Sequence, residues 1–316
     1  MTFLELNHDP SRTLLLVGSG RSGTTWLAEI LVDALGARLV FEPLRTQSVP
    51  WTWPVRRGHY LRPDDDSDQA VAEVLDRVLS GRIRNRFTDK YNRVRFPSRR
   101  VVKEVRATNL LPWIIRRYPR TPVVYLLRHP VPTAWSVSEL GWPDQLEPLL
   151  SQESLMQGPL KPFQSLIGEA AASPDTFHRI VLQWCLENFV PVHELDARRV
   201  HVVFYEQMVD DPGGELERLR AYLLPFGTDH WHPQTDSATS VARPSRSNYR
   251  GTDVTSGSAR LDAWVNEVPP DRVERALALV RGFGLDRIYD ISTRAVIPAD
   301  EVLLGGRHGE ALEPSR

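Results

Sequence analysis

The stretch Leu14-Leu-Leu-Val-Gly-Ser-Gly-Arg-Ser-Gly-Thr-Thr-Trp26 joins a short apolar run to a glycine-rich loop and the start of a helix. The apolar run, residues 14–17, is typical of a strand that is buried on both faces of a parallel sheet. Apolar residues then recur at helical spacing as far as Leu35, and Gly36 marks the helix end. Glycines let the backbone turn tightly beside a ligand, and the N–H groups at a helix start attract an anion. The stretch therefore predicts a phosphate-binding loop.

This loop is close to the phosphate loop of nucleotide triphosphatases but departs from it at one position. Gly18 and Gly23 have the required separation, yet Thr24 stands where that loop has its lysine. Phosphate binding is still expected, whereas ATP hydrolysis is not. A glycine-rich turn without a ligand is the alternative, but glycines, hydroxyls and a cation all converge here on one helix start. The predicted phosphate-binding residues are Gly20, Arg21, Ser22, Gly23, Thr24 and Thr25.

The rest of the chain alternates apolar runs with helical patterns. Further strands are predicted at 101–103, 123–127 and 200–204, and helices at 68–80, 108–118, 131–139, 175–196, 213–223 and 271–282. This alternation indicates an α/β fold, a P-loop-like three-layer sandwich with a central parallel sheet flanked by helices. We predict one domain over residues 1–304 and a flexible tail over 305–316. Residues 43–66 and 227–259 are read as long irregular segments.

Composition narrows the class of protein. The chain has 316 residues and a net charge of -1, so no strong field draws it to nucleic acid. No apolar run approaches the roughly 20 residues that span a bilayer. Cys185 is the one cysteine and cannot form an internal disulfide. These features predict a cytoplasmic protein without a membrane span, and its oligomeric state stays open.

A second signal follows the predicted strand at 123–127. Arg128-His-Pro130 comes directly after this strand, and Ser136 lies eight residues after the arginine. The carboxyl ends of strands are where open α/β sheets bind ligands, and a guanidinium can hold a phosphate through two hydrogen bonds. A third segment, Phe204-Tyr-Glu-Gln-Met208, follows the predicted strand at 200–204. Two separate anion sites on one sheet indicate a ligand with two phosphate groups.

Together these segments resemble the sulfotransferase superfamily, whose sulfuryl donor is 3′-phosphoadenosine-5′-phosphosulfate (PAPS). Residues 21–25 resemble its 5′-phosphosulfate loop, and Arg128 with Ser136 resembles its 3′-phosphate site. Trp26 and Tyr205 match residues that lie beside the adenine, although Trp26 also fits a core position. The resemblance implies PAPS as donor, 3′,5′-adenosine bisphosphate (PAP) as product, and no metal.

The catalytic residues implied by the resemblance favour the carbohydrate sulfotransferase branch. The cytosolic branch has a catalytic histidine two residues after a lysine that matches Lys103, but Val105 stands there. The carbohydrate branch has a Phe-Glu-Pro-Leu segment, which is present from Phe41 to Leu44, and a Lys-x-x-Arg strand end, which Lys103 and Arg106 match. Glu42 is therefore expected as general base. The alternative is that Glu42 pairs with an arginine as scaffold.

The other catalytic roles are carried by cations. Arg21 is expected to stabilise charge on the leaving group, and Lys103 or Arg106 either shares that task or holds the acceptor. Arg260, or another arginine of the segment 243–260, is expected to close over the 3′-phosphate. The His230-Trp-His232 pair is read as a surface loop rather than a metal site.

The acceptor is expected to be a carbohydrate or a glycosylated or other small molecule. Segment 43–62 combines aromatic side chains with arginines, which suits stacking on sugar rings, and residues 141–174 are expected to add a further wall to the acceptor cleft. Two other functions stay open, an ATP-dependent small-molecule kinase and a non-catalytic nucleotide-binding module.

Overall fold

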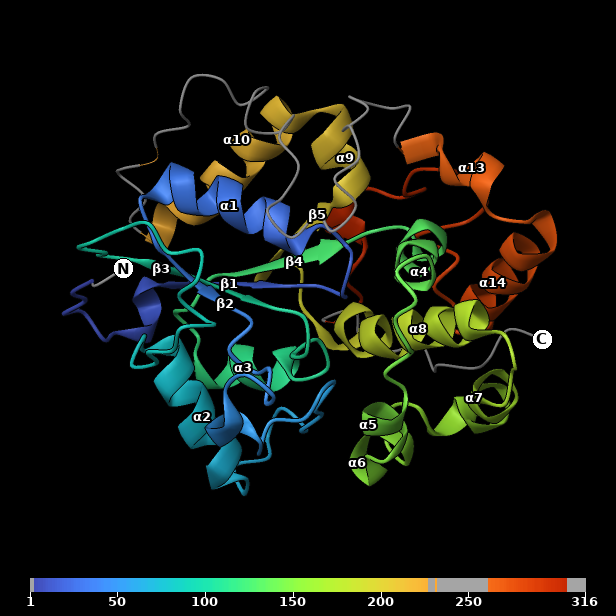
Figure 1. Ribbon diagram of the computed structural model, residues 1–316, viewed down its shortest axis with the longest axis horizontal. Helices are drawn as coiled ribbons and strands as arrows, with labels where there is room; N and C mark the ends of the chain where they lie inside the picture. The colour runs from blue at the N-terminus through green and yellow to red at the C-terminus, as the bar shows by residue number, and fades with distance from the viewer. Residues whose placement is uncertain (1–2, 227–230, 232–260, 306–316) are drawn as a thin grey trace.

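The computed structural model describes residues 3–226, 231 and 261–305 and has a parallel sheet at its centre (Figure 1). The five strands are β1 (Thr13–Val17), β2 (Arg38–Phe41), β3 (Arg100–Glu104), β4 (Val123–Leu127) and β5 (Val200–Phe204). Their order across the sheet is β2-β3-β1-β4-β5, and every neighbouring pair is parallel. β1 therefore lies between β3 and β4, with the loop that follows it near the middle of the sheet edge.

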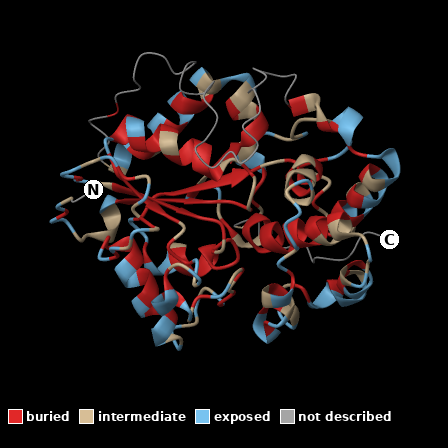
Figure 2. Cartoon of the chain, viewed as in Figure 1, coloured by how far each residue is buried: buried red, intermediate tan, exposed pale blue. Residues whose placement is uncertain are grey.

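Helices cover both faces of this sheet (Figure 1). One face carries α1 (Thr24–Leu35), α9 (Tyr205–Asp210) and α10 (Pro212–Leu223), and the other carries α2 (Gln69–Leu79), α3 (Leu111–Arg117) and α8 (Thr176–Glu194). Successive residues of β1 divide between the two cores: Leu14 and Leu16 pack with the first group, Leu15 and Val17 with the second. Apart from the partly buried His201 of β5, every strand residue is buried (Figure 2). The parallel sheet between two helical layers confirms the predicted fold class.

Several further helices lie beyond the carboxyl ends of the strands (Figure 1). α4 (Pro130–Ser138) and α14 (Pro270–Gly282) pack against α8. The other helices are α5 (Glu147–Leu150), α6 (Glu153–Met156), α7 (Gln164–Ala171) and α13 (Trp264–Glu267). Short 3-10 turns are η1 (Pro10–Arg12), η2 (Pro50–Thr52), η3 (Lys161–Phe163), η4 (Leu224–Phe226) and η5 (Ala299–Glu301).

The predicted elements recur within a few residues of their expected bounds, and β2 was not predicted. Arg38 opens β2 although it is completely buried, because Glu5 and Asp89 surround its guanidinium at 2.6 and 2.7 Å. Glu5 also pairs with the buried Arg100 of β3 at 2.7 Å. A buried strand is recognised in a sequence by its run of apolar residues. Arg38 interrupts that run in β2, and the partners that allow its burial lie far away in sequence.

Within the described ranges, no helix is both long and apolar enough to cross a bilayer. Apart from Gly305, the expected tail lies outside the described residues, and so do nearly all of residues 227–259.

Candidate active site

Residues at or just after the carboxyl ends of all five strands line one cavity. Its volume is about 960 Å³, at the upper end of the range for small-molecule sites. The strand order fixes the order of the contributions, with Glu42 after β2 at one end and Arg128 after β4 toward the other. The predicted site residues that line the cavity are Gly20, Arg21, Gly23, Thr24, Thr25, Trp26, Glu42, Lys103, Arg106, Arg128 and Tyr205.

The loop before α1 has the backbone that a phosphate cradle requires. Gly23 caps the helix with φ +99°, and a Cβ there would come within 2.6 Å of the Tyr205 ring. Arg21 also has a positive φ, 68°. The Ser22 hydroxyl is buried and donates to the Ser19 carbonyl at 2.6 Å. Ser22 therefore shapes the loop from within and does not line the cavity, whereas Ser19, which was not predicted, does.

The two predicted anion sites are joined by direct contacts. Arg128 donates from Nη1 to the carbonyl oxygen of Arg21 at 2.9 Å, and Arg21 donates from Nε to the Ser136 hydroxyl at 3.1 Å. Nε of Arg128 is buried and has no partner within the described part of the chain. A buried guanidinium nitrogen without an acceptor is costly, and an anion can supply one. Ser136 itself lies behind Arg21 rather than on the cavity wall.

An aromatic corner lies beside these arginines. The rings of Trp26 and Tyr205 meet edge to face at 5.6 Å between centroids, and the Arg128 guanidinium lies 4.4 Å from the centre of the Tyr205 ring. Both aromatic residues are buried in the core on the α1 side of the sheet, and both also line the cavity. The two interpretations of Trp26, core residue and ligand contact, are therefore compatible.

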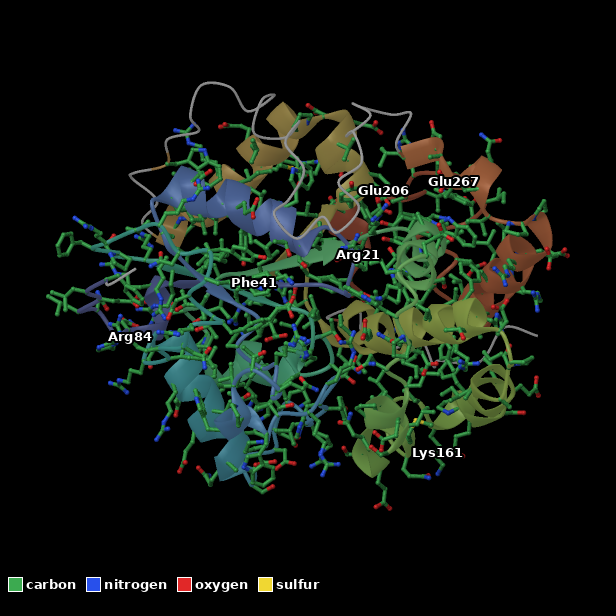
Figure 3. All side chains as sticks on the ribbon, in the orientation of Figure 1. Arg21, Phe41, Arg84, Lys161, Glu206 and Glu267 are labelled. Atoms are coloured by element: carbon green, nitrogen blue, oxygen red, sulfur yellow. The ribbon has the colours of Figure 1, made fainter. Side chains whose placement is uncertain are left out.

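A buried network holds the Arg128 segment from behind. Glu206 accepts hydrogen bonds from the His129 amide at 2.9 Å and from the Tyr289 hydroxyl at 2.9 Å. The His129 ring stacks on Trp264 at 4.8 Å, and burial lowers the pKa of His129 to about 4. The ring is therefore neutral at neutral pH. In Figure 3, Arg21 and Glu206 lie near the carboxyl ends of the strands, whereas Arg84 lies at the opposite side of the molecule.

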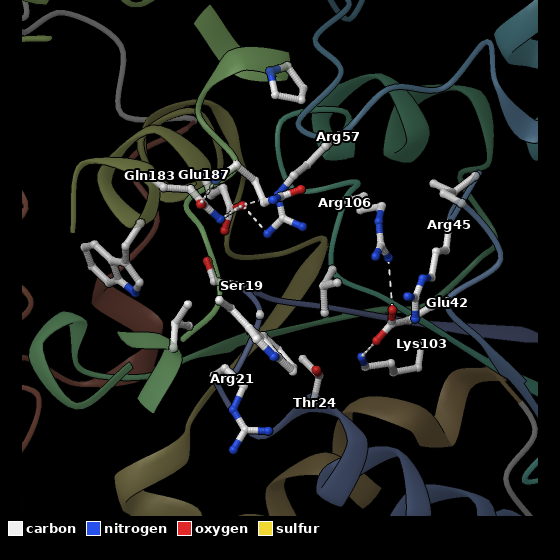
Figure 4. Close-up of a pocket in the computed structure, with 18 of the residues that line it drawn as sticks. Ser19, Arg21, Thr24, Glu42, Arg45, Arg57, Lys103, Arg106, Gln183 and Glu187 are labelled. Carbon is white, nitrogen blue, oxygen red and sulfur yellow. Dashed lines mark hydrogen bonds and ion pairs between the residues drawn. The ribbon is translucent and has the colours of Figure 1, made fainter. Parts of the chain in front are cut away.

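Glu42 lies between two cations. Lys103 Nζ lies 2.7 Å from its Oε1, and Arg106 Nη1 lies 3.0 Å from its Oε2 (Figure 4). Burial alone would raise the pKa of Glu42, but the charges of Lys103 and Arg106 outweigh it and lower the pKa to about 2. The backbone of Glu42 has φ 43°, a region that non-glycine residues seldom adopt. Its amide donates to the Lys103 carbonyl at 2.8 Å. These contacts fix an ionised carboxylate in the cavity wall.

Glu104 supports this cluster and was not predicted. It is almost fully buried, and its Oε1 accepts hydrogen bonds from the amides of Val105 and Arg106 at 2.8 and 3.0 Å. Its Oε2 accepts from the Leu44 amide at 2.8 Å, which ties the segment after β2 to the end of β3. The sequence signal that could have identified Glu104 is an acidic residue between Lys103 and Arg106.

The cavity wall is strongly cationic. Among the residues that the structure describes, three carboxylates line it: Glu42, Glu147 and Glu187. Eight cations from the same described ranges line it: Arg21, Arg45, Arg56, Arg57, Lys90, Lys103, Arg106 and Arg128. This excess of positive charge suits an anionic ligand.

The predicted acceptor segments do reach the cavity. Trp53 and Arg56 of the first segment line it, as do Trp142, Gln145 and Ser151 of the second. Residues 147–150 and 153–156 of the second segment form short helices. The arginines expected to close over the 3′-phosphate, including Arg260, lie outside the described residues, and so does the His230 and His232 pair. The described residues contain no group of three or more His, Cys, Asp or Glu side chains placed to hold a metal.

The chain was compared with curated proteins, with solved structures and with models of protein families. None of the curated proteins matches the chain. Mouse sulfotransferase SULT7A1 complexed with PAP is 16% identical, with 89% of this chain and 87% of that chain covered and a TM-score of 0.43. The sulfotransferase domain of the Synechococcus PCC 7002 olefin synthase is 15% identical (92% and 100% covered, TM-score 0.39). A sulfotransferase from Alicyclobacillus acidocaldarius is 16% identical (84% and 94% covered, TM-score 0.35).

The family model described as "Sulfotransferase family" matches residues 14–226, which is more than half of the chain and includes the phosphate loop, Glu42, Arg128 and Tyr205. The chain belongs to the sulfotransferase family.

Proposed function

We propose that the protein is a PAPS-dependent sulfotransferase that transfers the sulfuryl group to a hydroxyl of a carbohydrate or a glycosylated or other small-molecule acceptor. The observation that carries this proposal is the contact between Arg128 and the Arg21 carbonyl at 2.9 Å. It joins the predicted phosphate loop to Arg128, the predicted second anion-binding residue, at the ends of neighbouring strands in one cavity. PAPS has a phosphate on each side of its ribose and requires such a pair.

The residues present fit this donor. The N–H groups at the start of α1 and the hydroxyls of Thr24 and Thr25 would hold the 5′-phosphosulfate. Arg128, whose buried Nε has no acceptor in the described chain, would hold the 3′-phosphate, with Ser136 acting through Arg21. Trp26 and Tyr205 would flank the adenine. When bound, PAPS supplies an electrophilic sulfur whose bond to a phosphate oxygen breaks.

Glu42 is proposed as the general base. One of its carboxylate oxygens takes the proton of the acceptor hydroxyl as that oxygen attacks sulfur, and Arg21 and Lys103 neutralise charge on the departing phosphate. With a pKa of about 2 Glu42 is always ionised at neutral pH, but it is a weak base. Lys103 is one of the two cations that lower this pKa. A Lys103 side chain that turns toward an anionic donor would release Glu42 and strengthen it as a base.

The rim of the cavity supports a carbohydrate-like acceptor. Trp53 and Trp142 both line the cavity while their side chains remain 69% and 41% exposed. Exposed aromatic faces at a polar opening suit stacking on sugar rings. Gln47 and Gln145, which also line the cavity, add amide groups that can hydrogen-bond hydroxyls.

The experiment that tests this function is calorimetric titration of the full chain with PAP, beside ATP and Mg²⁺. We expect PAP to bind with a dissociation constant on the order of 1 μM and to be preferred over ATP. Arg128→Ala should weaken PAP binding about 10- to 100-fold, because a charge-assisted contact is lost. The control is Arg120→Ala, which removes an exposed surface arginine and should leave the affinity for PAP unchanged. Failure to bind PAP, or a clear preference for ATP with Mg²⁺, would overturn the proposal in favour of a kinase.

A further inference from the structure

Arg57 is a cation of the cavity wall that the sequence motifs do not explain. It belongs to the segment after β2, and its Nε and Nη2 both lie close to Oε1 of Glu187, at 3.0 and 2.7 Å. Glu187 is on α8, 130 residues away, and its side chain is only 2% exposed. Gln183, one turn earlier on α8, donates to the same oxygen at 2.9 Å. The carboxylate is therefore fixed, and it fixes the plane of the guanidinium.

The backbone around Arg57 is equally constrained. The Gly58 amide donates to the Arg106 carbonyl at 2.8 Å, and Gln152 donates to the Gly58 carbonyl at 3.2 Å. Gly58 has φ +61°, and a Cβ there would come within 2.1 Å of Leu149. A glycine is therefore required, and it is clamped between the end of β3 and α5. Arg57 is held in place before any ligand binds.

The guanidinium lies beside the phosphate loop. A Cβ built on Gly20, the residue before Arg21, would lie 3.8 Å from Nη2 of Arg57. Figure 4 shows Arg57 across the cavity from Thr24, with Glu42, Lys103 and Arg106 along another side. Nη1 of Arg57 has no hydrogen-bond acceptor among the residues that the structure describes. Arg57 thus lies close to Gly20 of the phosphate loop and lines the same cavity as the proposed base.

We propose that Arg57 is a further catalytic residue that binds the sulfuryl oxygens of the donor, and that Glu187 is its positioning residue. This inference rests on the proposed function. A guanidinium fixed on one side by a buried carboxylate keeps its remaining N–H groups for a planar set of anionic oxygens. Arg21, Lys103 and Arg57 then approach the transferred group from the ends of β1 and β3 and from the segment after β2.

The role of Arg57 follows from the charges in the reaction. A lone pair of the acceptor oxygen forms the new bond to sulfur, and the bond from sulfur to the phosphate oxygen breaks with its electrons remaining on that oxygen. The proton of the acceptor hydroxyl goes to Glu42. The sulfuryl oxygens that do not react carry negative charge throughout, and Arg57 donates hydrogen bonds to them. Arg57 is thereby distinguished from Arg128, which would contact a group that PAPS and PAP share.

The test compares PAPS and PAP as ligands of the full chain without acceptor, so that no turnover occurs. Arg57→Gln should weaken PAPS binding about tenfold while PAP binding changes less than twofold. Glu187→Gln should also weaken PAPS binding more than PAP binding, but by less than Arg57→Gln does. Arg57→Lys should bind PAPS as weakly as Arg57→Gln, because lysine lacks the planar, forked set of guanidinium donors. Arg62→Gln removes an exposed arginine outside the cavity and is the matched control.

The outcomes separate this inference from the proposed function. Wild-type protein that binds neither ligand overturns the proposed function itself. Wild-type protein that binds both, with an Arg57→Gln variant that loses PAPS and PAP equally or loses neither, overturns the role of Arg57 alone. If Arg57→Gln does not fold, the same comparison on Arg57→Lys decides the question, since that variant keeps the charge beside Glu187.

Discussion

The two halves of the cavity are built differently. In the half proposed to bind the nucleotide, here called the donor half, most groups come from the phosphate loop and the first turn of α1, and Arg128 contacts that loop through the Arg21 carbonyl. The other half, here called the acceptor half, contains the proposed base Glu42 and also Arg57, and its charged groups meet across long distances in sequence. Glu42 and Lys103 are 61 residues apart, and Arg57 and Glu187 are 130 residues apart. The groups of the donor half are positioned mainly by local backbone, whereas those of the acceptor half are positioned by ion pairs between residues that are distant in sequence.

This difference has consequences for substitutions. A change in the donor half should act on nucleotide affinity, because the backbone there forms the binding surface. A change in the acceptor half should leave PAP affinity unchanged and act on contacts with the sulfuryl group, on the chemical step and on stability, because buried ion pairs are costly to break.

Glu42→Gln should produce the largest effect, a fall in kcat of about 10²- to 10⁴-fold, because the proposed base is lost. PAP affinity should stay within about twofold of wild type. Transfer of radiolabelled sulfur from PAPS to a screened acceptor measures the rate, and calorimetry measures the affinity. Glu73→Gln, on the exposed face of α2, is the control. A variant that keeps its rate would leave Glu42 with the scaffold role alone.

Glu42 should also make stability depend on pH. Its pKa in the folded protein is about 2, below its ordinary value of 4.5. A depressed folded pKa stabilises the protein above the unfolded pKa, and this stabilisation is lost as the pH falls from about 4.5 toward 2. The full loss is roughly 3 kcal/mol.

The measurement is the free energy of unfolding of wild type and Glu42→Gln by denaturant titration between about pH 6 and 3. The advantage of wild type should shrink as the pH falls. A constant difference over this range would show that the two cations do not hold the carboxylate ionised, and would weaken the description of the acceptor half as an ion-pair scaffold.

The residues that line the cavity could be predicted from the sequence more readily in the donor half than in the acceptor half, and the reason is physical. A glycine-rich turn after an apolar run is a local signal, and so is an arginine directly after a strand, so residues 18–26 and Arg128 could be found without a structure. Glu42, Lys103 and Arg106 were found through family resemblance. No local pattern indicates that Arg57 faces Glu187, because α8 brings this acid into place only in the folded chain.

Gly23→Ala should weaken PAP binding about 30-fold. The alanine would need φ +99° and would come within 2.6 Å of the Tyr205 ring, so the loop and the aromatic corner must both shift. Gly36→Ala is the matched control, because Gly36 also has a positive φ, 55°, but no atom lies within 4 Å of its added Cβ. It should lower stability by about 1 kcal/mol and leave PAP binding unchanged. Equal PAP affinity of the two variants would contradict a donor site made by local backbone.

Tyr125→Phe should have the smallest effect and tests how far the donor loop depends on distant support. The Tyr125 hydroxyl donates to Asn188 of α8, and Asn188 donates to the Ser19 hydroxyl at 3.0 Å. Losing the first contact leaves a buried amide oxygen without that donor, which should cost about 1–2 kcal/mol of unfolding free energy. Asn188 keeps its contact with the Trp184 carbonyl at 2.7 Å, so PAP affinity should fall no more than about threefold.

The control is Tyr118→Phe, which removes a hydroxyl that donates to Asp76, away from the cavity lining. It should lower the unfolding free energy by a similar amount and leave PAP affinity unchanged. If Tyr125→Phe instead reduced PAP affinity more than about tenfold, the phosphate loop would need α8 as much as Arg57 does, and both halves of the cavity would rest on tertiary contacts.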